Sequence, residues 1–271
     1  MRWVNRRIGR GNSFLLGAVP IALLVLLYLI AAASRQAANP NDKILPMPGA
    51  MVEAMAALVV QRDPLSGQFL FCTDTLASLE RLGLGLGIST LSALLVGLVL
   101  GALPPIRATF GPLVTGIAVI PPIALLPILF IAFGLGEAAK VALIVIGIAP
   151  FMIRDIAAHV AALPREQIIK AQTLGAGSWQ LMLRVALPQA MPRLIQAMRL
   201  SLGPAWVFLI SAEAIASDTG LGYRIFLVRR YLSMDIILPY VAWIALLAVS
   251  MDFILTRASR RLYPWAHGAG H

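Results

Sequence analysis

The sequence predicts an all-α, multi-pass membrane protein. Of its 271 residues, 59% are hydrophobic and 13% are charged, whereas an ordinary globular domain is about 45–50% apolar and about 25% charged. The apolar residues are gathered into runs, most of them long enough for the ~20 residues that cross the hydrocarbon core of a bilayer. We therefore expect a transmembrane domain over residues 14–256, between a cytosolic segment over 1–13 and a cytosolic tail over 257–271.

Six apolar runs are the predicted spans, with five or seven as alternatives. They cover residues 14–33, 83–103, 111–133, 138–153, 200–216 and 236–256. The run at 138–153 is short, and we expect it to extend through Ala158. The first run follows four arginines, as a secretory signal would, but the apolar region of a signal has only about 7–15 residues. Because this run is longer and more spans follow, we expect a retained first helix.

The net charge of +10 reports the orientation of the chain in the membrane. With six spans and a cytosolic N-terminus, fourteen of the 22 Lys and Arg residues fall in cytosolic segments. An excess of Lys and Arg in cytoplasmic loops is the usual determinant of membrane topology. The basic composition therefore indicates topology and does not indicate binding to nucleic acid.

The residue types needed for catalysis or cofactor binding are scarce. The single cysteine, Cys72, excludes an internal disulfide and a cysteine-only metal site, and the three histidines do not cluster with carboxylates at ligand spacing. The chain also lacks the Gly-x-x-x-x-Gly-Lys-Ser/Thr loop that cradles ATP phosphates. We predict no catalytic residue, metal or cofactor in this chain, and expect any ATP and Mg²⁺ to be bound by a partner.

The longest external stretch is expected over residues 34–82. It opens with turn formers at residues 39–42, and Gly49 to Val60 then has the apolar spacing of a helix. A loop through Asp63, Pro64 and Gly67 should follow. The sequence thus predicts a short surface helix, and a plain connector is the alternative.

The second span is rich in glycine, at Gly83, Gly85, Gly87, Gly97 and Gly101. Small residues let membrane helices approach closely and pack by dispersion. We therefore expect this helix inside the bundle.

The third span contains Pro121, Pro122 and Pro127. Proline removes a backbone donor and bends a helix. A broken helix at membrane depth is tolerated where it is buried or lines a cavity. We predict that Pro121 and Pro122 lie near a translocation pathway, and a simple packing kink is the alternative.

Glu213 is the one residue of the fifth span that is clearly ionisable within the membrane, and Ser211 lies two residues before it. A carboxylate at mid-helix costs about 2.5–3.5 kcal/mol on insertion scales, so it should face the bundle interior or a wet cavity. One interpretation is that Glu213 and Ser211 line the pathway. The other is a hydrogen bond from Glu213 to a hydroxyl on a neighbouring helix, with these candidates: Ser89, Thr90 and Thr115.

A glycine-rich turn follows the fifth span. It runs from Asp218 through Gly220 and Gly222, and basic residues come next. We place this turn on the external side, as a gate or a contact for a binding protein, together with Arg229. The arginines of this region, Arg224, Arg229 and Arg230, either attract an anion or pair with Asp218 and Asp235. In the last span, Asp252 is expected to pair with Arg199 or Arg257.

The most informative polar segment lies in the expected cytosolic loop over residues 159–190. Pro164 suits the first turn of a helix and Glu166 favours its positive end, so a helix is predicted from Pro164 to Leu174. Gly175 to Gly177 should end it. Ser178 is expected to cap a second short helix, which Pro188 should end.

This loop resembles the EAA loop of the permeases of importer-type ABC transporters. Gly175, nine residues, and then Val185-Ala186-Leu187-Pro188 match the family's Gly, nine residues, Ile-x-Leu-Pro. Ile169 and Lys170 stand where the family has Glu and Ala.

Five further segments resemble the nitrate/taurine/sulfonate-type branch of that family, in the same order and at similar spacing: Leu45-Pro46-Met47-Pro48, Ile120 to Pro127, Phe133 to Glu137, Ala212-Glu213, and Gly220-Leu221-Gly222-Tyr223.

The resemblance implies a MetI-like permease fold and a set of partners. They are a second permease copy, two cytosolic ABC ATPase subunits and a periplasmic or lipid-anchored substrate-binding protein, with the chain in the bacterial inner membrane. It also implies that the loop carries a coupling helix that docks on the ATPase. The residues assigned to that contact are Glu166, Lys170, Ala171, Thr173, Leu174, Gly175, Ala176, Trp179, Leu187 and Pro188.

The resemblance leaves the substrate open among nitrate, sulfonates, bicarbonate and other small nitrogen or sulfur compounds. The segment Tyr223 to Tyr231 looks most like permeases associated with urea or guanidine metabolism. A self-sufficient secondary transporter or channel is the alternative function, and a membrane-embedded enzyme is a more distant one. Transport that survives ATP depletion but collapses with a protonophore would favour a secondary transporter.

Replacing Gly175 with a bulky residue, or Ala171 with Asp, is expected to abolish uptake and leave membrane insertion intact, because both changes alter the predicted coupling helix. Uptake of labelled solute and the amount of chain in the membrane fraction are the measurements. Normal uptake by both variants would contradict coupling through this loop.

Overall fold

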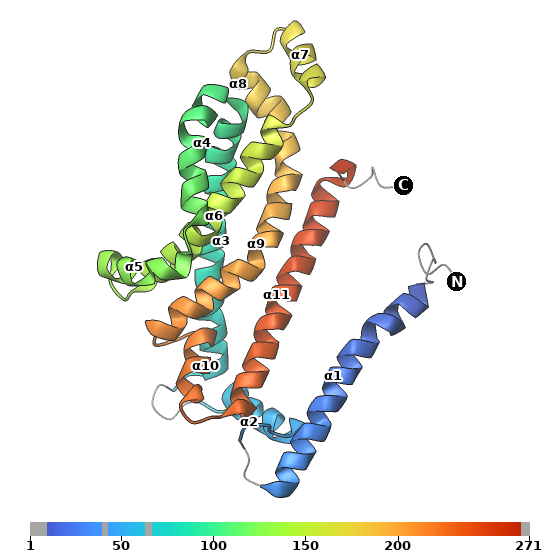
Figure 1. The fold of residues 1–271 in the computed structure, drawn as a ribbon, viewed down its shortest axis with the longest axis vertical. Coiled ribbons are helices and arrows are strands. Elements are labelled where there is room, and N and C mark those ends of the chain that lie inside the picture. Colours follow the sequence, from blue (N-terminus) through green and yellow to red (C-terminus); the bar gives the residue numbers. More distant parts are fainter. Residues whose placement is uncertain (1–9, 40–42, 63–66, 267–271) are drawn as a thin grey trace.

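The computed structural model describes residues 10–39, 43–62 and 67–266 (Figure 1). Expectations that concern residues 1–9, 40–42, 63–66 and 267–271 lie outside these ranges. They include most of the predicted N-terminal segment, the turn formers at residues 40–42, Asp63 and Pro64 of the predicted loop, and the end of the tail.

Five helices are long and apolar enough to cross a membrane. They are α1 (Arg10–Ala38), α3 (Leu70–Ala102), α6 (Glu137–Ala161), α9 (Leu187–Ile215) and α11 (Met234–Leu262). A sixth span is possible if the bent pair that includes α4 (Pro104–Val119) is counted as one. No strand occurs within the ranges that the structure describes. The predicted all-α, multi-pass fold class is confirmed.

The predicted break in the third span is also confirmed. After α4 the chain continues as a short 3₁₀ turn, η1 (Pro122–Leu125), and then α5 (Leu126–Phe133). The segment Pro122–Phe133 is bent by 87° from α4. Pro121 and Pro122 lie at the break, at the start of η1, where the backbone N–H groups that prolines lack would have no partner within the helix. Figure 1 shows α5 projecting sideways from the bundle, about midway along its length.

A stripe of small residues on α3 packs against α6 and forms the centre of the bundle. The stripe consists of every fourth residue of the helix, and all five of its members are buried: Gly85, Ser89, Ala93, Gly97 and Gly101. A β-carbon added at Gly85 would lie 2.6 Å from Cγ2 of Ile144, and one added at Gly101 would lie 2.6 Å from Cβ of Val160. The two helices thus approach as closely as small residues allow.

The prediction that this helix lies inside the bundle is confirmed, but only three of the five glycines, Gly85, Gly97 and Gly101, make the close contact. Gly83 and Gly87 are exposed, and a β-carbon at either would touch nothing within 4 Å. The reason is helical geometry, because these two positions lie off the face that the four-residue spacing defines.

Helix α3 begins at Leu70, thirteen residues before the expected start of the second span. Hydropathy hides this extension because it contains Asp74, Ser78 and Arg81. The structure buries all three polar side chains against other elements. The residues expected to complete the external loop therefore form the first three turns of a core helix.

The peripheral elements surround this core. Helix α2 (Pro48–Val60), predicted as a short surface helix, lies at the end of the molecule that also carries α10 (Leu221–Arg229) (Figure 1). Helix α1 leans away from the bundle (Figure 1), and only 6% of its most apolar 18-residue stretch is buried. Such a wide apolar surface is compatible with lipid or with another membrane helix.

Replacing Gly101 with Leu is expected to destabilise the bundle, because the new side chain would meet Val160 and the carbonyl oxygen of Ala157, 2.8 Å from the added β-carbon. Overpacking of this kind typically costs about 1–3 kcal/mol. Thermal unfolding of the purified protein in detergent measures the loss. Gly87→Leu is the matched control, since that position is open; equal losses in the two variants would contradict the packing described here.

Candidate functional site

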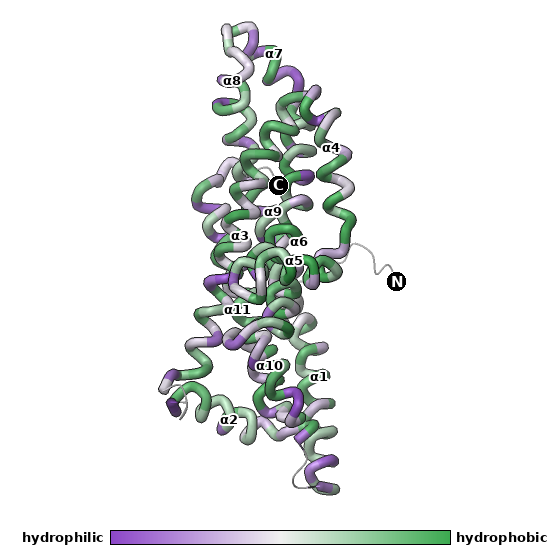
Figure 2. The backbone as a smooth tube through the Cα atoms, turned by 90° about the vertical axis from the view of Figure 1, so that its left-hand side faces the viewer, coloured by the Kyte–Doolittle hydropathy of each residue, from purple (hydrophilic) through white to green (hydrophobic). Residues whose placement is uncertain are grey.

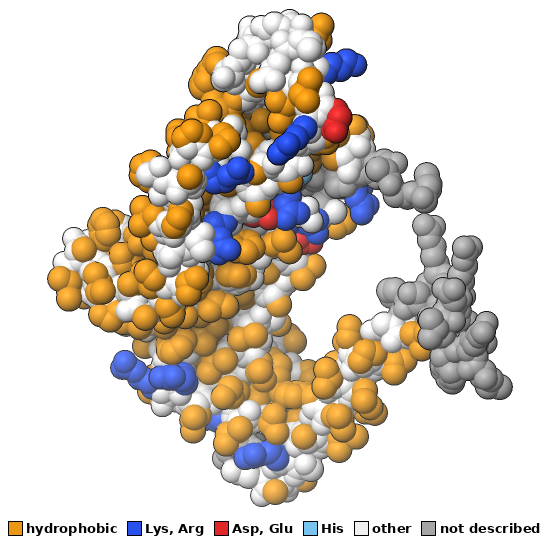
Figure 3. Space-filling model, turned by 45° about the horizontal axis from the view of Figure 1, so that its top comes forward, with side chains coloured by type: hydrophobic (Ala, Val, Ile, Leu, Met, Phe, Trp, Pro, Cys, Tyr) orange, Lys and Arg blue, Asp and Glu red, His pale blue; other side chains and the backbone are white. Residues whose placement is uncertain are grey.

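One end of the molecule carries a projecting polar segment, which we call the knob and define as residues 164–181. It comprises α7 (Arg165–Thr173), the turn after it and α8 (Ser178–Leu181). Figure 2 shows this end and the opposite one as less apolar than the middle of the molecule. Figure 3 shows Lys and Arg side chains on the knob-bearing half and hydrophobic ones over the side of the bundle.

A Schellman turn ends α7 and gives the knob its shape. The N–H of Ala176 donates to the carbonyl oxygen of Ala171 at 3.0 Å, and the N–H of Gly175 donates to that of Gln172 at 2.9 Å. This motif requires a left-handed residue just after the helix, and Gly175 supplies it with a φ of 84°. The predicted stop at Gly175 thus has a definite geometry.

The second half of the knob differs from the prediction in two respects. Ser178 does not cap α8: the capping residue is Gly177, whose N–H donates to Oε1 of Gln180 at 3.1 Å. Pro188 does not end the helix, because a π turn, η2 (Met182–Ala186), joins α8 to α9 without a break. The wider turn accommodates the missing proline N–H, so the knob is continuous with a core helix.

The tip of the knob exposes large apolar side chains. Leu174 is 81% exposed and Trp179 is 65% exposed. Of the other residues assigned to ATPase contact, those exposed are Glu166, Lys170, Thr173, Gly175 and Pro188, and those half-buried are Ala171, Ala176 and Leu187. The structure therefore gathers the assigned residues at one end of the molecule, with an apolar tip on a polar segment.

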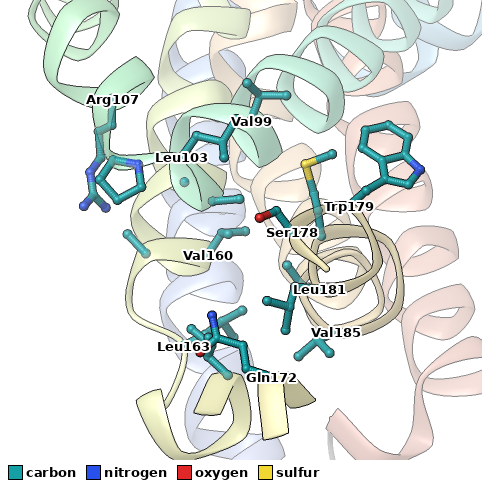
Figure 4. Close-up of a pocket in the computed structure, with 17 residues that line it drawn as sticks. Val99, Leu103, Arg107, Val160, Leu163, Gln172, Ser178, Trp179, Leu181 and Val185 are labelled. Atoms are coloured by element: carbon teal, nitrogen blue, oxygen red, sulfur yellow. The ribbon is translucent and has the colours of Figure 1, made fainter. Parts of the chain in front are cut away.

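A cavity of about 580 Å³ lies under the knob (Figure 4). Its walls are mostly apolar and come from the knob, from the corner between α3 and α4, and from the end of α6. Leu181 of the knob and Val185 of the π turn line one side of it, and Val99, Leu103 and Val160 line the other. The knob thus rests against the bundle on one side and is free at its tip.

The opposite half of the molecule contains what we call the charged cluster, contributed by α3, α6, α9 and α10. Its members are Asp74, Ser78, Arg81, Glu137, Lys140, Glu213 and Arg224. Five of these residues are buried: Asp74, Ser78, Arg81, Lys140 and Glu213. Burial of so many ionisable groups is expected only where they are paired.

Glu213 is fully buried, and both of its carboxylate oxygens accept hydrogen bonds. Nη1 of Arg81 donates to Oε1 at 2.7 Å, Oγ of Ser78 donates at 2.8 Å, and the N–H of Gly222 donates to Oε2 at 2.8 Å. The interpretation of Glu213 as a structural hydrogen-bonding residue is therefore favoured, but its predicted partners Ser89, Thr90 and Thr115 are wrong. The true partners were missed because hydropathy placed them in a loop.

Arg81 joins three elements at once. Besides Glu213 it binds Glu137, with Nη2 donating to Oε1 at 2.8 Å and Nε donating to Oε2, and Nη1 donates to the carbonyl oxygen of Thr219 at 2.7 Å. Lys140 adds a second cation, with Nζ at 2.9 Å from Oε1 of Glu137 and 3.1 Å from Oγ of Ser217. Helices α3, α6 and α9 are thereby tied together.

The glycine-rich turn wraps the cluster. Gly220 has a φ of 126°, and a β-carbon there would lie 2.5 Å from the Glu213 carboxyl carbon. A β-carbon at Gly222 would lie 2.8 Å from the carbonyl oxygen of Ile210. Both positions, predicted as part of an external gate, are therefore needed for the close approach of the turn to Glu213.

Asp74 anchors α10 to α3. It accepts hydrogen bonds from Nε of Arg224 at 2.8 Å and from the N–H of Gly220 at 3.0 Å. Burial lowers the pKa of Arg224, but the hydrogen bond and the charge of Asp74 raise it, so that it stays above its usual value. Of the alternatives for this arginine, pairing is correct, with Asp74 in place of Asp218 or Asp235.

The remaining predicted residues lie apart from the cluster. Arg229 and Asp218 are exposed, and the guanidinium of Arg229 lies 4.8 Å from the centre of the Phe226 ring. Ser211 donates to the carbonyl oxygen of Val207 within its own helix. Pro121 is exposed beside half-buried Pro122 at the break described above.

Of the two partners expected for Asp252, Arg199 is the correct one. Nε of Arg199 lies 2.8 Å from Oδ1 and Nη2 lies 3.0 Å from Oδ2. This two-bond arrangement joins α9 to α11.

The apolar helices, the broken helix, the buried charges and the projecting knob define a multi-pass α-helical membrane protein of the permease type. The chain belongs to the family described as the binding-protein-dependent transport system inner membrane component, whose model matches residues 84–265.

Named relatives agree with this assignment. The chain is 35% identical to the taurine transport system permease protein TauC of Escherichia coli, over 71% of this chain and 70% of that one. It is 32% identical to a probable ABC transporter permease protein of Brucella abortus, over 83% and 88% of the two chains. It is 30% identical to the bicarbonate transport system permease protein of Synechococcus elongatus, over 62% and 61%.

The fold is also that of a solved transporter chain. Two inward-facing structures of the MetNI methionine ABC transporter match with TM-scores of 0.54 and 0.57 at 21% and 20% identity. The matches cover 68% and 78% of this chain, and 92% and 96% of those chains. The expected MetI-like fold is confirmed.

Glu213→Ala is expected to destabilise the protein strongly, because it leaves Arg81 buried with one carboxylate fewer. Removing one partner of a buried pair costs about 3–5 kcal/mol. Asp252→Ala is the matched control, since the Asp252 side chain is 45% exposed and exposed pairs contribute about 0–1 kcal/mol. Thermal unfolding in detergent measures both, and comparable losses would contradict the structural role of Glu213.

Proposed function

We propose that this chain is the membrane subunit of an ATP-driven importer and forms the translocation pathway for a small polar solute. Its family membership supports the role of transport permease, and relatives are named for taurine, aliphatic sulfonate and bicarbonate transport. In this proposal the chain pairs with a second copy in the bacterial inner membrane, with both termini in the cytosol. A substrate-binding protein delivers the solute at the end that carries α2 and α10.

The observation that carries the proposal is the knob. The knob presents two large apolar side chains, Leu174 at 81% exposure and Trp179 at 65% exposure, and Trp179 also lines the edge of the cavity under the knob. Exposed aromatic and aliphatic groups on a rigid support are typical of protein interfaces. The partner we infer is a cytosolic ABC ATPase subunit, two copies of which would serve the permease pair.

The connection of the knob to the core supports a role in coupling. Helix α9 starts at the π turn beside the knob and ends near the charged cluster. Oε1 of Gln167 accepts a hydrogen bond from Nε2 of Gln189 at 2.9 Å, so α7 is held to α9 as well. Movement of the knob on ATP binding would therefore be passed to α9 as a rigid body.

The solute we propose is a small oxyanion of the sulfonate or bicarbonate type, with nitrate and urea- or guanidine-like compounds as the other candidates. Ligand affinities of the binding protein encoded beside this chain would discriminate among them.

Trp179→Ala and Leu174→Asp are expected to weaken ATPase binding without lowering stability, because both side chains are exposed in the free chain. Loss of an interface anchor of this kind costs about 2 kcal/mol or more, roughly 30-fold in affinity. The measurement is binding of the purified ABC ATPase encoded beside this chain to the permease in nanodiscs, together with solute-stimulated ATP hydrolysis.

Trp265→Ala is the matched control, since Trp265 is 58% exposed at the end of the chain that follows α11. Unchanged ATPase binding in both knob variants would refute the assignment of the knob. Equal loss in the Trp265 variant would show that the effect is general.

A further inference from the structure

We propose that Arg81 and Lys140 form a binding site for one small monovalent oxyanion, and that the carboxylate of Glu137 occupies this site until the solute displaces it. The proposal rests on the importer function above and extends it, because it assigns the residues and the charge of the transported solute.

The three side chains differ sharply in exposure. The side chains of Arg81 and Lys140 are 6% and 4% exposed, whereas that of Glu137 is 61% exposed. The two cations are thus part of the core, and the anion that neutralises them lies at the surface. An internal ion pair would instead bury both partners, as Glu213 and Arg81 are buried.

Glu137 lies at the end of a membrane-spanning helix. It is the first residue of α6, directly after the turn that follows α5, and α6 is one of the helices long and apolar enough to cross a membrane. Because an exposed carboxylate is unfavourable in lipid, Glu137 should face water or a partner chain. We infer that it faces the water-filled mouth of the pathway.

The geometry of the site suits an oxyanion. Nε and Nη2 of Arg81 each donate to a different oxygen of Glu137, and Nζ of Lys140 shares one of them. This fork matches the paired oxygens of a carboxylate, and a sulfonate or bicarbonate presents the same arrangement.

The charge balance selects a monovalent anion. Arg81 and Lys140 carry two positive charges, and fully buried Glu213 keeps its bond to Arg81 at 2.7 Å. When Glu137 moves away, one positive charge remains, which one monoanion neutralises. A guanidinium cation would be repelled, so the site favours the sulfonate and bicarbonate candidates over guanidine.

Glu137 also has room to move. The two residues on either side of Leu135 are glycines, of which Gly134 has a φ of 74°, and a β-carbon at Gly134 or Gly136 would meet nothing within 4 Å. The carboxylate thus extends from the first residue of α6, next to an open turn, whereas the two cationic side chains are buried.

Methanesulfonate is the probe for a direct test with the purified full-length chain in nanodiscs at constant chloride and ionic strength. In Glu137→Gln the competing charge is removed, so we expect methanesulfonate to raise the midpoint of thermal unfolding with an apparent Kd about tenfold lower than in the wild type. Dimethyl sulfone, which has a similar shape without charge, and guanidinium should cause no such shift. Glu137→Gln with Lys140→Gln should abolish the gain.

Glu80→Gln is the control for a general change of charge, since Glu80 is exposed on α3 next to Arg81 and has no ion pair among the described residues. Glu137→Ala provides a second variant if Gln retains the contact with Arg81. The proposal is overturned if neither Glu137 variant gains methanesulfonate binding, or if Glu80→Gln or dimethyl sulfone gives the same response. The test needs neither ATPase nor binding protein, so its failure is distinguishable from failure of the proposed function.

Discussion

The pairing of Arg81 with Glu213 is the interaction on which the rest of this end of the bundle depends. Each side chain is buried, and each would be strongly unfavourable alone in an apolar environment. Because Arg81 also binds Glu137 and the carbonyl oxygen of Thr219, one guanidinium joins α3, α6, α9 and the turn before α10. The glycines of that turn are then required, since any side chain at Gly220 would collide with the Glu213 carboxylate.

Two different forces hold the two halves of the bundle. Between α3 and α6, the stripe that contains Gly97 and Gly101 allows contact by dispersion, which is the force available when lipid gives no hydrophobic drive. Toward α10, the helices are held by the ion pairs and hydrogen bonds of the charged cluster instead of by dispersion. The apolar half is suited to rigid packing, whereas the polar half has a member, Glu137, with a largely exposed side chain.

Helix α9 connects the two functional regions. It begins at the π turn that carries the knob and ends two residues after Glu213. A helix of 29 residues is about 43 Å long, which is more than the ~30 Å hydrocarbon core of a bilayer. The proposed ATPase contact and the charged cluster therefore lie on one continuous element, and coupling between them needs no chain of separate contacts.

Sequence alone determined the features that depend on composition and local spacing: the all-α membrane fold, the break at Pro121, the stop at Gly175 and the likeness of the knob to a known loop. It did not determine which glycines of α3 face a neighbour, that α3 starts at Leu70, or that α8 continues past Pro188. Only the tertiary structure decided the side-chain partners of Glu213, because Ser78 and Arg81 are separated from it by more than 130 residues. Their polarity lowers local hydropathy, and the energy that allows their burial comes from pairing with those distant residues.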